Sequence, residues 1–406
     1  MSFKKSFPIL VILSIIPILQ GYDSNANMEY GTLLMKYNLS NLHLGYYRMA
    51  FTLASMIGAL IGGMAVDKWN LRRLAIIILI ALSSSSLVLQ FYDSFVLIFI
   101  HRCILGFSFG FLVLSFQVFL VDIASTKHRG KILFIFLGAS IIGSLIYLAF
   151  RYFFVVKSNT YSLTYPQYQI PYIVLPLLIF FVIRYLPGTI NTDSEKVYPF
   201  KYLFRPKQKV LIYAMVILAI LTSLANSNLY IYVSSQIVFD NNAEFLYLIP
   251  MIIGVAATVL GIVTIDVFGR KSLLKFGIIA LIISATTNIL IPLITKQPMV
   301  ILGFLHLYYF IFQFTIITTS TIIILEYLPK QIRGRGMILF AIIYSVPNGI
   351  NNFLNKTFIF ESNYNVIISS LIILTTLIIC LMLIRKHLIE TKGLLFNEIK
   401  SRINIE

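Results

Sequence analysis

Long apolar runs, separated by short charged or turn-rich segments, dominate this sequence of 406 residues. A helix that spans the hydrocarbon core of a bilayer needs about 20 predominantly apolar residues. Charged residues make up only 12% of the chain, against roughly 25% in ordinary soluble domains. The sequence therefore excludes a soluble globule and predicts an all-α membrane protein with 12 transmembrane helices. The expected spans lie at about residues 7–30, 45–66, 74–92, 95–122, 132–152, 170–186, 210–238, 245–265, 273–293, 299–327, 336–358 and 365–384.

A polar stretch over residues 187–209 divides the predicted spans into two sets of six. We expect an N-terminal six-helix bundle over residues 1–186 and, after a cytoplasmic connecting loop at 187–209, a C-terminal six-helix bundle over 210–385. Residues 386–406 then form a short cytoplasmic tail. Lys4 and Lys5 precede the first run, but no small-residue cleavage site of the usual kind follows it. We therefore expect an uncleaved first helix rather than a signal peptide.

Basic residues are distributed unevenly between the two sides of the predicted bundle. The chain has 32 Lys and Arg against 15 Asp and Glu, a formal net charge of +17. Most of the basic residues fall in segments on the side that holds both termini, and this asymmetry places that side in the cytoplasm. The bilayer thus explains the positive charge without a nucleic-acid partner. We expect a multi-pass protein of the plasma membrane. The basic residues on the outer side are Lys36, Arg48, Arg151, Lys157, Lys296 and Lys356.

The two predicted halves resemble each other in sequence. The segment VDIASTKHRGKILF (121–134) matches LEYLPKQIRGRGMILF (325–340), and GGMAVDKWNLRR (62–73) corresponds to GIVTIDVFGRK (261–271). An internal duplication explains both matches. Two related six-helix halves are typical of secondary transporters, in which the substrate site lies between the halves near the bilayer midplane.

Acidic and basic residues recur at the inner ends of the predicted helices in both halves. Exposed ion pairs of this kind contribute only about 0 to 1 kcal/mol each, so simple solvation at helix ends is one interpretation. The recurrence favours another: a cytoplasmic gate that holds the halves together on this side while the outer side is open. The candidate gate residues are Asp67 with Arg72 and Arg73, Asp122 with Arg129, Asp266 with Arg270, and Glu326 with Arg333.

These motifs resemble those of the sugar porter family within the major facilitator superfamily. GYD (21–23) resembles the family's first-helix motif, GGMAVDKWNLRR its G-x-x-x-D-x-x-G-R-R loop, and HRCILGFSFG (101–110) its R-x-x-x-G fourth helix. IDVFGRKSLL (265–274) and EYLPKQIRG (326–334) resemble the loop signatures of the second half. The resemblance spans nearly the whole chain and implies alternating-access transport of a sugar, with no chemistry on the substrate.

The chain departs from the family where sugar porters contact their substrate. Of the seventh-helix motif Q-Q-x-x-G-x-N only Asn228 survives, in TSLANSN, and FTIITTSTI (314–322) replaces the tenth-helix tryptophan and Gly-Pro pattern. Amide and hydroxyl groups suit sugar hydroxyls, but helix-to-helix hydrogen bonding in the membrane is the competing use. The candidate substrate-binding residues are Asn228, Tyr232, Gln313, Asn348 and Asn352.

Asp23 and Arg102 are ionisable residues within apolar spans, where an unpaired charge costs several kcal/mol. We expect them to pair. The resemblance implies that they form the protonation site, because proton-driven sugar porters have an acid and an arginine at these positions. A static structural ion pair is the alternative. A carboxyl group that is buried and then separated from its guanidinium takes up a proton more readily, which would couple the proton to transport.

The sequence thus predicts a secondary transporter that moves a hexose or related small polar solute, with a proton as its possible co-substrate and no cofactor. No nucleophile–base pair, Walker loop or metal-ligand cluster is recognisable, so we expect neither an enzyme nor a metal site. Two alternatives stay open: a transporter of another solute, such as an amino acid, organic acid or drug-like cation, and a non-transporting nutrient receptor. The expected partners are the small solute and the lipid bilayer, and the oligomeric state is not predicted.

Overall fold

A computed structural model shows a bundle of helices, and no strand occurs among the residues that it describes. These are residues 3–26, 37–38, 40–68, 71–91, 94–153, 170–174, 176, 198–205, 208–225, 248–295, 297–357 and 364–403.

The first half of the chain supplies seven of the described helices. They are α1 (Phe3–Leu13), α2 (Ile15–Ala26), α4 (Asn41–Lys68), α5 (Leu71–Val88), α6 (Phe95–Ile123), α7 (Arg129–Gly138) and α8 (Ser140–Arg151). The break between α1 and α2 has a local cause, because Pro17 lacks the N–H that would bond the carbonyl of Leu13. The two helices together form one span, as α7 and α8 do.

The second half begins with the short 3₁₀ helix η3 (Phe200–Phe204) and ends with a helix beyond the last span. Its further helices are α10 (Lys209–Leu224), α12 (Leu248–Phe268), α13 (Arg270–Ile294), α14 (Pro298–Phe312), α15 (Thr318–Tyr327), α16 (Arg333–Thr357) and α17 (Tyr364–His387). Of these, α14 and α15 belong to one span. The π-helical turn η6 (Gln313–Ile317) joins α14 to α15, and the turn η7 (Lys330–Ile332) precedes α16. The terminal helix is α18 (Phe396–Arg402).

Within the described part of the chain, eight helical segments are long and apolar enough to cross a membrane. They coincide with eight of the predicted spans: Phe7–Ser24, Gly45–Val66, Phe95–Ile123, Arg129–Arg151, Ile249–Phe268, Arg270–Ile291, Met299–Tyr327 and Ser370–His387. Helices α5, α10 and α16 lie at three further predicted spans. Of the expected span at 170–186, the structure describes residues 170–174, which are helical, and 176. The all-α prediction is confirmed, and the arrangement is consistent with 12 spans.

The outward faces of the helices are apolar, as lipid contact requires. On α13, Phe276, Ile283 and Leu290 are 60%, 61% and 49% exposed and recur every seven residues, so they form one stripe. The opposite face carries Leu274 and Ile278, which are completely buried. A soluble protein does not expose such a stripe without a partner, whereas acyl chains cover it.

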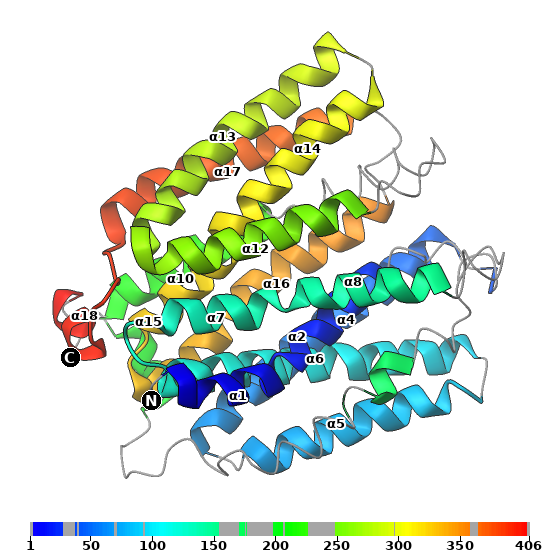
Figure 1. Cartoon of the computed structure of the whole chain (residues 1–406), viewed down its shortest axis with the longest axis horizontal. Coiled ribbons are helices and arrows are strands. Elements are labelled where there is room, and N and C mark those ends of the chain that lie inside the picture. Colours follow the sequence, from blue (N-terminus) through cyan, green and yellow to red (C-terminus); the bar gives the residue numbers. More distant parts are fainter. Residues whose placement is uncertain are drawn as a thin grey trace.

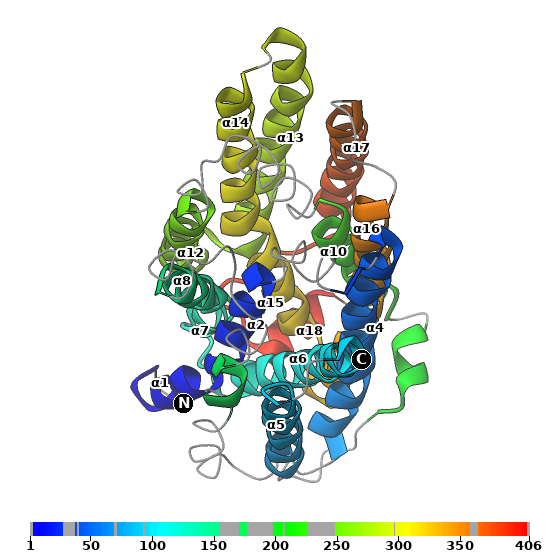
Figure 2. The same cartoon turned by 90° about the vertical axis from the view of Figure 1, so that its right-hand side faces the viewer.

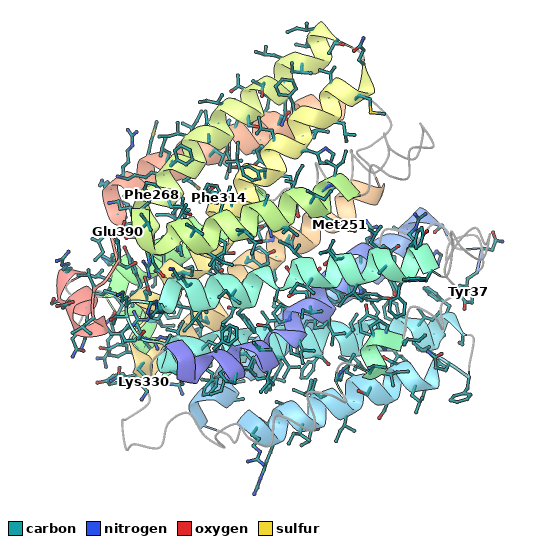
Figure 3. All side chains as sticks on the ribbon, in the orientation of Figure 1. Tyr37, Met251, Phe268, Phe314, Lys330 and Glu390 are labelled. Carbon is teal, nitrogen blue, oxygen red and sulfur yellow. The ribbon has the colours of Figure 1, made fainter. Side chains whose placement is uncertain are left out.

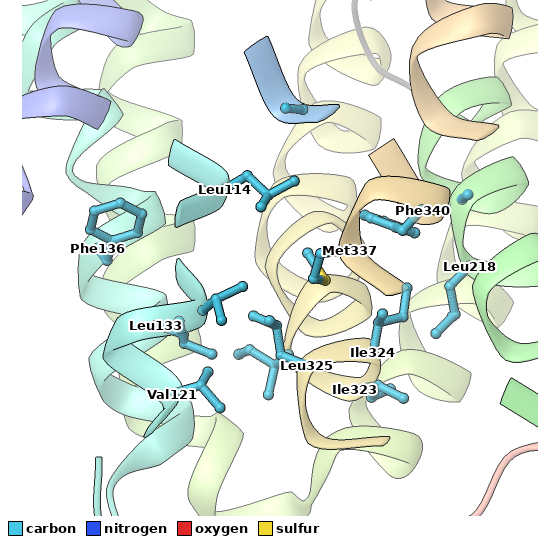
Figure 4. Close-up of a cluster of buried hydrophobic side chains, with 14 of the residues drawn as sticks. Leu114, Val121, Leu133, Phe136, Leu218, Ile323, Ile324, Leu325, Met337 and Phe340 are labelled. Carbon is cyan, nitrogen blue, oxygen red and sulfur yellow. The ribbon is translucent and has the colours of Figure 1, made fainter. Parts of the chain in front are cut away.

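The two halves meet along two seams. Helix α4 packs against α16 and helix α7 against α12, and Figure 2 shows these seams on opposite sides of the bundle. Between them, α7 also contacts α15, and buried apolar side chains of both halves, including Leu133 and Leu325, share one cluster (Figure 4). The described ends of the chain lie at the same end of the bundle (Figure 1).

Candidate functional site: two buried charge clusters

The predicted pair of Asp23 and Arg102 is formed. Arg102 Nη1 on α6 donates to both carboxylate oxygens of Asp23 on α2, each at 2.8 Å. Both residues are buried, with 6% and 5% of their surfaces exposed. Two opposite charges in this geometry compensate each other inside a region where either alone would be expensive. The buried pair is therefore a site at which a change in protonation has a large energetic effect.

Tyr172 is a third member of this first cluster that the sequence analysis missed. Its hydroxyl donates to Asp23 Oδ1 at 2.9 Å, and its ring packs edge-on against the rings of Tyr22 and His101. Among 33 Phe and 24 Tyr, nothing in the sequence distinguished this tyrosine from a packing residue. The contact brings helical residues 170–174 onto α2 and α6.

The guanidinium of Arg102 also lies over aromatic rings of α4. Its Cζ is 4.0 Å from the ring centre of Phe51 and 5.4 Å from that of Tyr47. A cation within about 6 Å of a ring face is attracted to it electrostatically. Arg102 thus has a carboxylate partner on α2 and an aromatic partner on α4.

The second cluster lies at the end of the bundle near α15 and α18 and joins the two halves. Arg129 at the start of α7 pairs with Glu326 on α15 at 3.7 Å, and Asp122 at the end of α6 pairs with Arg333 at the start of α16. The sequence motifs group Asp122 with Arg129 and Glu326 with Arg333. In the structure these ion pairs are instead exchanged between the repeats, so each crosses from one half to the other.

Arg270 extends this second cluster within the C-terminal half. Its Nη2 is 3.3 Å from Glu326 and 3.0 Å from Asp266, and its side chain is only 1% exposed. Gly130 of the N-terminal half lies directly against this group, since a Cβ there would be 2.7 Å from Asp266 Oδ1. The halves therefore approach each other closely at this position, and a methyl group there would displace the Asp266 carboxylate.

The segment after the last span covers the second cluster. The ring of Phe396 on α18 lies 3.9 Å from Cζ of Arg129 and 4.2 Å from Cζ of Arg333. Phe396 was not among the predicted site residues, because a single phenylalanine beyond the last span resembles an ordinary tail residue. Residues of the predicted cytoplasmic tail thus contact both halves of the bundle.

Glu390 fixes this segment to α13. Its carboxylate accepts hydrogen bonds from the backbone N–H groups of Arg270 at 2.8 Å and Lys271 at 3.0 Å. These N–H groups lie in the first turn of the helix, where no carbonyl of the same helix can accept their hydrogen bonds. The positive end of the helix dipole also attracts the negative charge of the carboxylate. Glu390 and Lys330 lie at the same end of the bundle and Tyr37 at the other (Figure 3). Glu390 was not among the predicted site residues.

The remaining predicted gate residues lie apart from these contacts or outside the description. Arg72 and Arg73 stand in the first turn of α5, half-buried and exposed respectively. Asp67 lies near the end of α4, but its side chain is outside the described residues. The role of these three residues stays a prediction.

The predicted substrate-binding residues are placed in part. Gln313 opens the π-helical turn η6, and such turns are frequent at functional sites. Asn348 is half-buried on α16. Asn352 belongs to the same helix, with its side chain outside the described residues, and Asn228 and Tyr232 lie outside them altogether. Their contact with substrate stays a prediction.

A family model described as the Major Facilitator Superfamily matches residues 10–350. The chain belongs to the major facilitator superfamily. It is therefore a membrane transporter and not an enzyme, and the resemblance inferred from its charged motifs is confirmed at this level. A comparison with curated proteins finds no match.

Solved structures of the superfamily share the fold over nearly the whole chain. A structure described as the proton:xylose symporter XylE bound to 6-bromo-6-deoxy-D-glucose has a TM-score of 0.80 at 18% identity and covers 98% of each chain. An inward-open structure of the xylose transporter XylE from E. coli has a TM-score of 0.72 at 17% identity, covering 98% of this chain and 99% of that one. The transporter FucP in an outward conformation has a TM-score of 0.73 at 14% identity, covering 94% and 98%.

Proposed function

We propose that this protein is a secondary transporter that moves a hexose or related small polar solute by alternating access and couples this movement to a proton at Asp23. The observation that carries the proposal is the buried pair of Asp23 and Arg102, 2.8 Å apart. A titratable pair within the bundle, with no enzymatic use for it, is suited to ion coupling. Fold neighbours described as a proton:xylose symporter and as FucP support a sugar-like solute.

The second cluster supplies the alternating-access part of the proposal. Its ion pairs cross between the halves at one end of the bundle, so they stabilise the state in which that end is closed. The crossing pairs must separate when this end opens. We assign this end to the cytoplasm because Lys and Arg concentrate there in the sequence. Both termini then lie on the cytoplasmic side of the plasma membrane.

Transport in proteoliposomes tests the proposal. Uptake and counterflow of labelled D-glucose and D-xylose are measured with and without an inward proton gradient, for the wild type and for Asp23→Asn. We expect the gradient to stimulate saturable wild-type uptake, and we expect Asp23→Asn to lose this stimulation while it retains counterflow. Glu398→Gln, which alters an exposed acid on α18, is the matched control and should behave like the wild type.

The outcomes separate the parts of the proposal. Sugar uptake that ignores the gradient in the wild type contradicts the coupling. No sugar flux in a folded preparation contradicts the assigned solute and directs attention to other solutes or to a sensing role.

A further inference from the structure

Among the described residues, donors of two different kinds reach the Asp23 carboxylate from two different elements. Arg102 Nη1 provides a charged donor at 2.8 Å to both oxygens, and the hydroxyl of Tyr172 provides a neutral donor at 2.9 Å to Oδ1. Tyr172 is itself 2% exposed, so water does not compete freely for this bond. A donor to a carboxylate favours its charged form over its protonated form.

The Arg102 guanidinium has a second partner on the side of α4. The centre of the Phe51 ring lies 4.0 Å from Cζ, and the ring attracts the part of the positive charge that the carboxylate does not neutralise. While Asp23 is charged, the carboxylate neutralises most of that charge. Once Asp23 is protonated, the guanidinium loses this counter-charge, and the ring then stabilises it more strongly than before.

We propose that Tyr172 and Phe51 are positioning residues that set, in opposite directions, the pH at which the Asp23–Arg102 pair takes up a proton. Tyr172 favours the deprotonated pair by its hydrogen bond to the carboxylate. Phe51 favours the protonated state, because it supports Arg102 when the carboxylate no longer does. This inference rests on the proposed function, since it concerns the same proton site.

Other titratable groups surround the pair, and no variant removes more than one of them, so the effect of the rest is common to all measurements. Arg102 and His101 stand on α6, and the His101 Nδ1 lies 2.9 Å from the hydroxyl of Ser85 on α5. Among the described residues, the tyrosines around the pair include Tyr22 from α2, Tyr47 from α4, Tyr147 from α8 and Tyr172 from residues 170–174.

Infrared difference titration tests the inference without requiring a transported solute. The full-length protein in lipid is titrated, and the carbonyl stretch of a protonated carboxyl group that disappears in Asp23→Asn is assigned to Asp23. Tyr172→Phe keeps the ring and removes only the hydroxyl, so we expect the midpoint of this band to move upward by roughly one pH unit. Phe51→Leu keeps an apolar side chain and removes the ring, so we expect the midpoint to move downward.

Tyr147→Phe is the matched control. Tyr147 is buried and packs edge-on against Tyr22 at a centroid distance of 5.8 Å, so its substitution tests for a general effect of removing a tyrosine hydroxyl nearby. We expect its midpoint to equal that of the wild type. Thermal unfolding of each variant checks that it is folded.

The results separate this inference from the proposed function. An unchanged midpoint in Tyr172→Phe, or shifts of the same sign in Tyr172→Phe and Phe51→Leu, overturns the inference. No band dependent on Asp23 overturns it as well. If Asp23→Asn abolishes the gradient stimulation of transport while Tyr172→Phe has the wild-type midpoint, only the inference fails and the proposed function stands.

Discussion

Glu326 is the residue whose neutralisation should most directly open the proposed cytoplasmic gate. Its side chain is 1% exposed and faces two guanidinium groups, Arg129 at 3.7 Å and Arg270 at 3.3 Å. Glu326→Gln keeps the size of the side chain and removes its charge. Arg129, on the other half, then loses its counter-charge in a position that water barely reaches. Arg270 lies on the same half as Glu326, so its loss is common to the closed and open states.

The size of the effect follows from what each arginine retains. Removing one partner of a buried ion pair costs about 3 to 5 kcal/mol. Across the interface between the halves, Arg129 keeps the ring of Phe396 at 3.9 Å, so the lower end applies. About 3 kcal/mol against the closed state changes the ratio of closed to open molecules by roughly 150-fold.

Pulsed electron spin resonance measures this ratio as a distance distribution. One spin label replaces Lys127, between α6 and α7, and the other replaces Ser272 in the first turn of α13; both positions are exposed. Cys103 and Cys380, the two native cysteines, are first changed to Ala. We expect a single short distance in the background protein and a dominant longer one in Glu326→Gln.

Glu398→Gln, in the same labelled background, is the control for a change of one negative charge. We expect it to leave the distribution as it is. A distribution in Glu326→Gln that matches the background would refute the reasoning, since it would mean that the buried charges do not hold the halves together.

Three further results are expected. Asp122→Arg and Arg333→Asp should each slow initial uptake in proteoliposomes by at least about tenfold. The double variant should recover much of the lost uptake rate, because it restores the ion pair with its charges exchanged. A double variant slower than both single variants contradicts the pairing. Gly130→Ala places a methyl group 2.7 Å from Asp266 Oδ1 and so displaces this carboxylate, and the labelled protein should shift toward the longer distance; an unchanged distribution contradicts the close approach. Glu390→Ala removes the acceptor at the start of α13 and should cost about 1 to 2 kcal/mol, lowering Tm by a few degrees in thermal unfolding; an unchanged Tm contradicts the role as a cap.

Hydropathy predicted the spans well because each is long enough to be seen without tertiary information. It is weaker where a span carries polar residues, as α16 does with Asn348, Asn351 and Asn352, or where the described helix is short, as for the 16 residues of α10. Helix α16 packs against α4 and α10, and α10 also packs against α17, so these helices are held by the bundle rather than by their own hydropathy.

The charged residues of the second cluster were predicted from the internal sequence repeat, but the repeat does not determine which of them form ion pairs. It places an acid and an arginine close together in each half, which suggests pairing within a motif. The observed pairs, Asp122 with Arg333 and Glu326 with Arg129, depend on how the two halves face each other. Tyr172 and Phe396 escaped prediction for a similar reason, because an aromatic residue acquires its role only from the charge that it touches.

The exchange of partners between the repeats has a consequence for the opened state. When the halves separate, Arg129 loses Glu326, yet Asp122 of its own motif travels with it on the same rigid half. In the same way, Arg333 leaves Asp122 and keeps Glu326 on its own side. Each half thus carries equal numbers of acidic and basic residues in this cluster. When the gate opens, these residues can exchange partners across the interface for partners on their own half, so no charge is left without a counter-charge. Duplication of a single ancestral motif explains this charge balance, since each copy of the motif contributes an acidic and a basic residue.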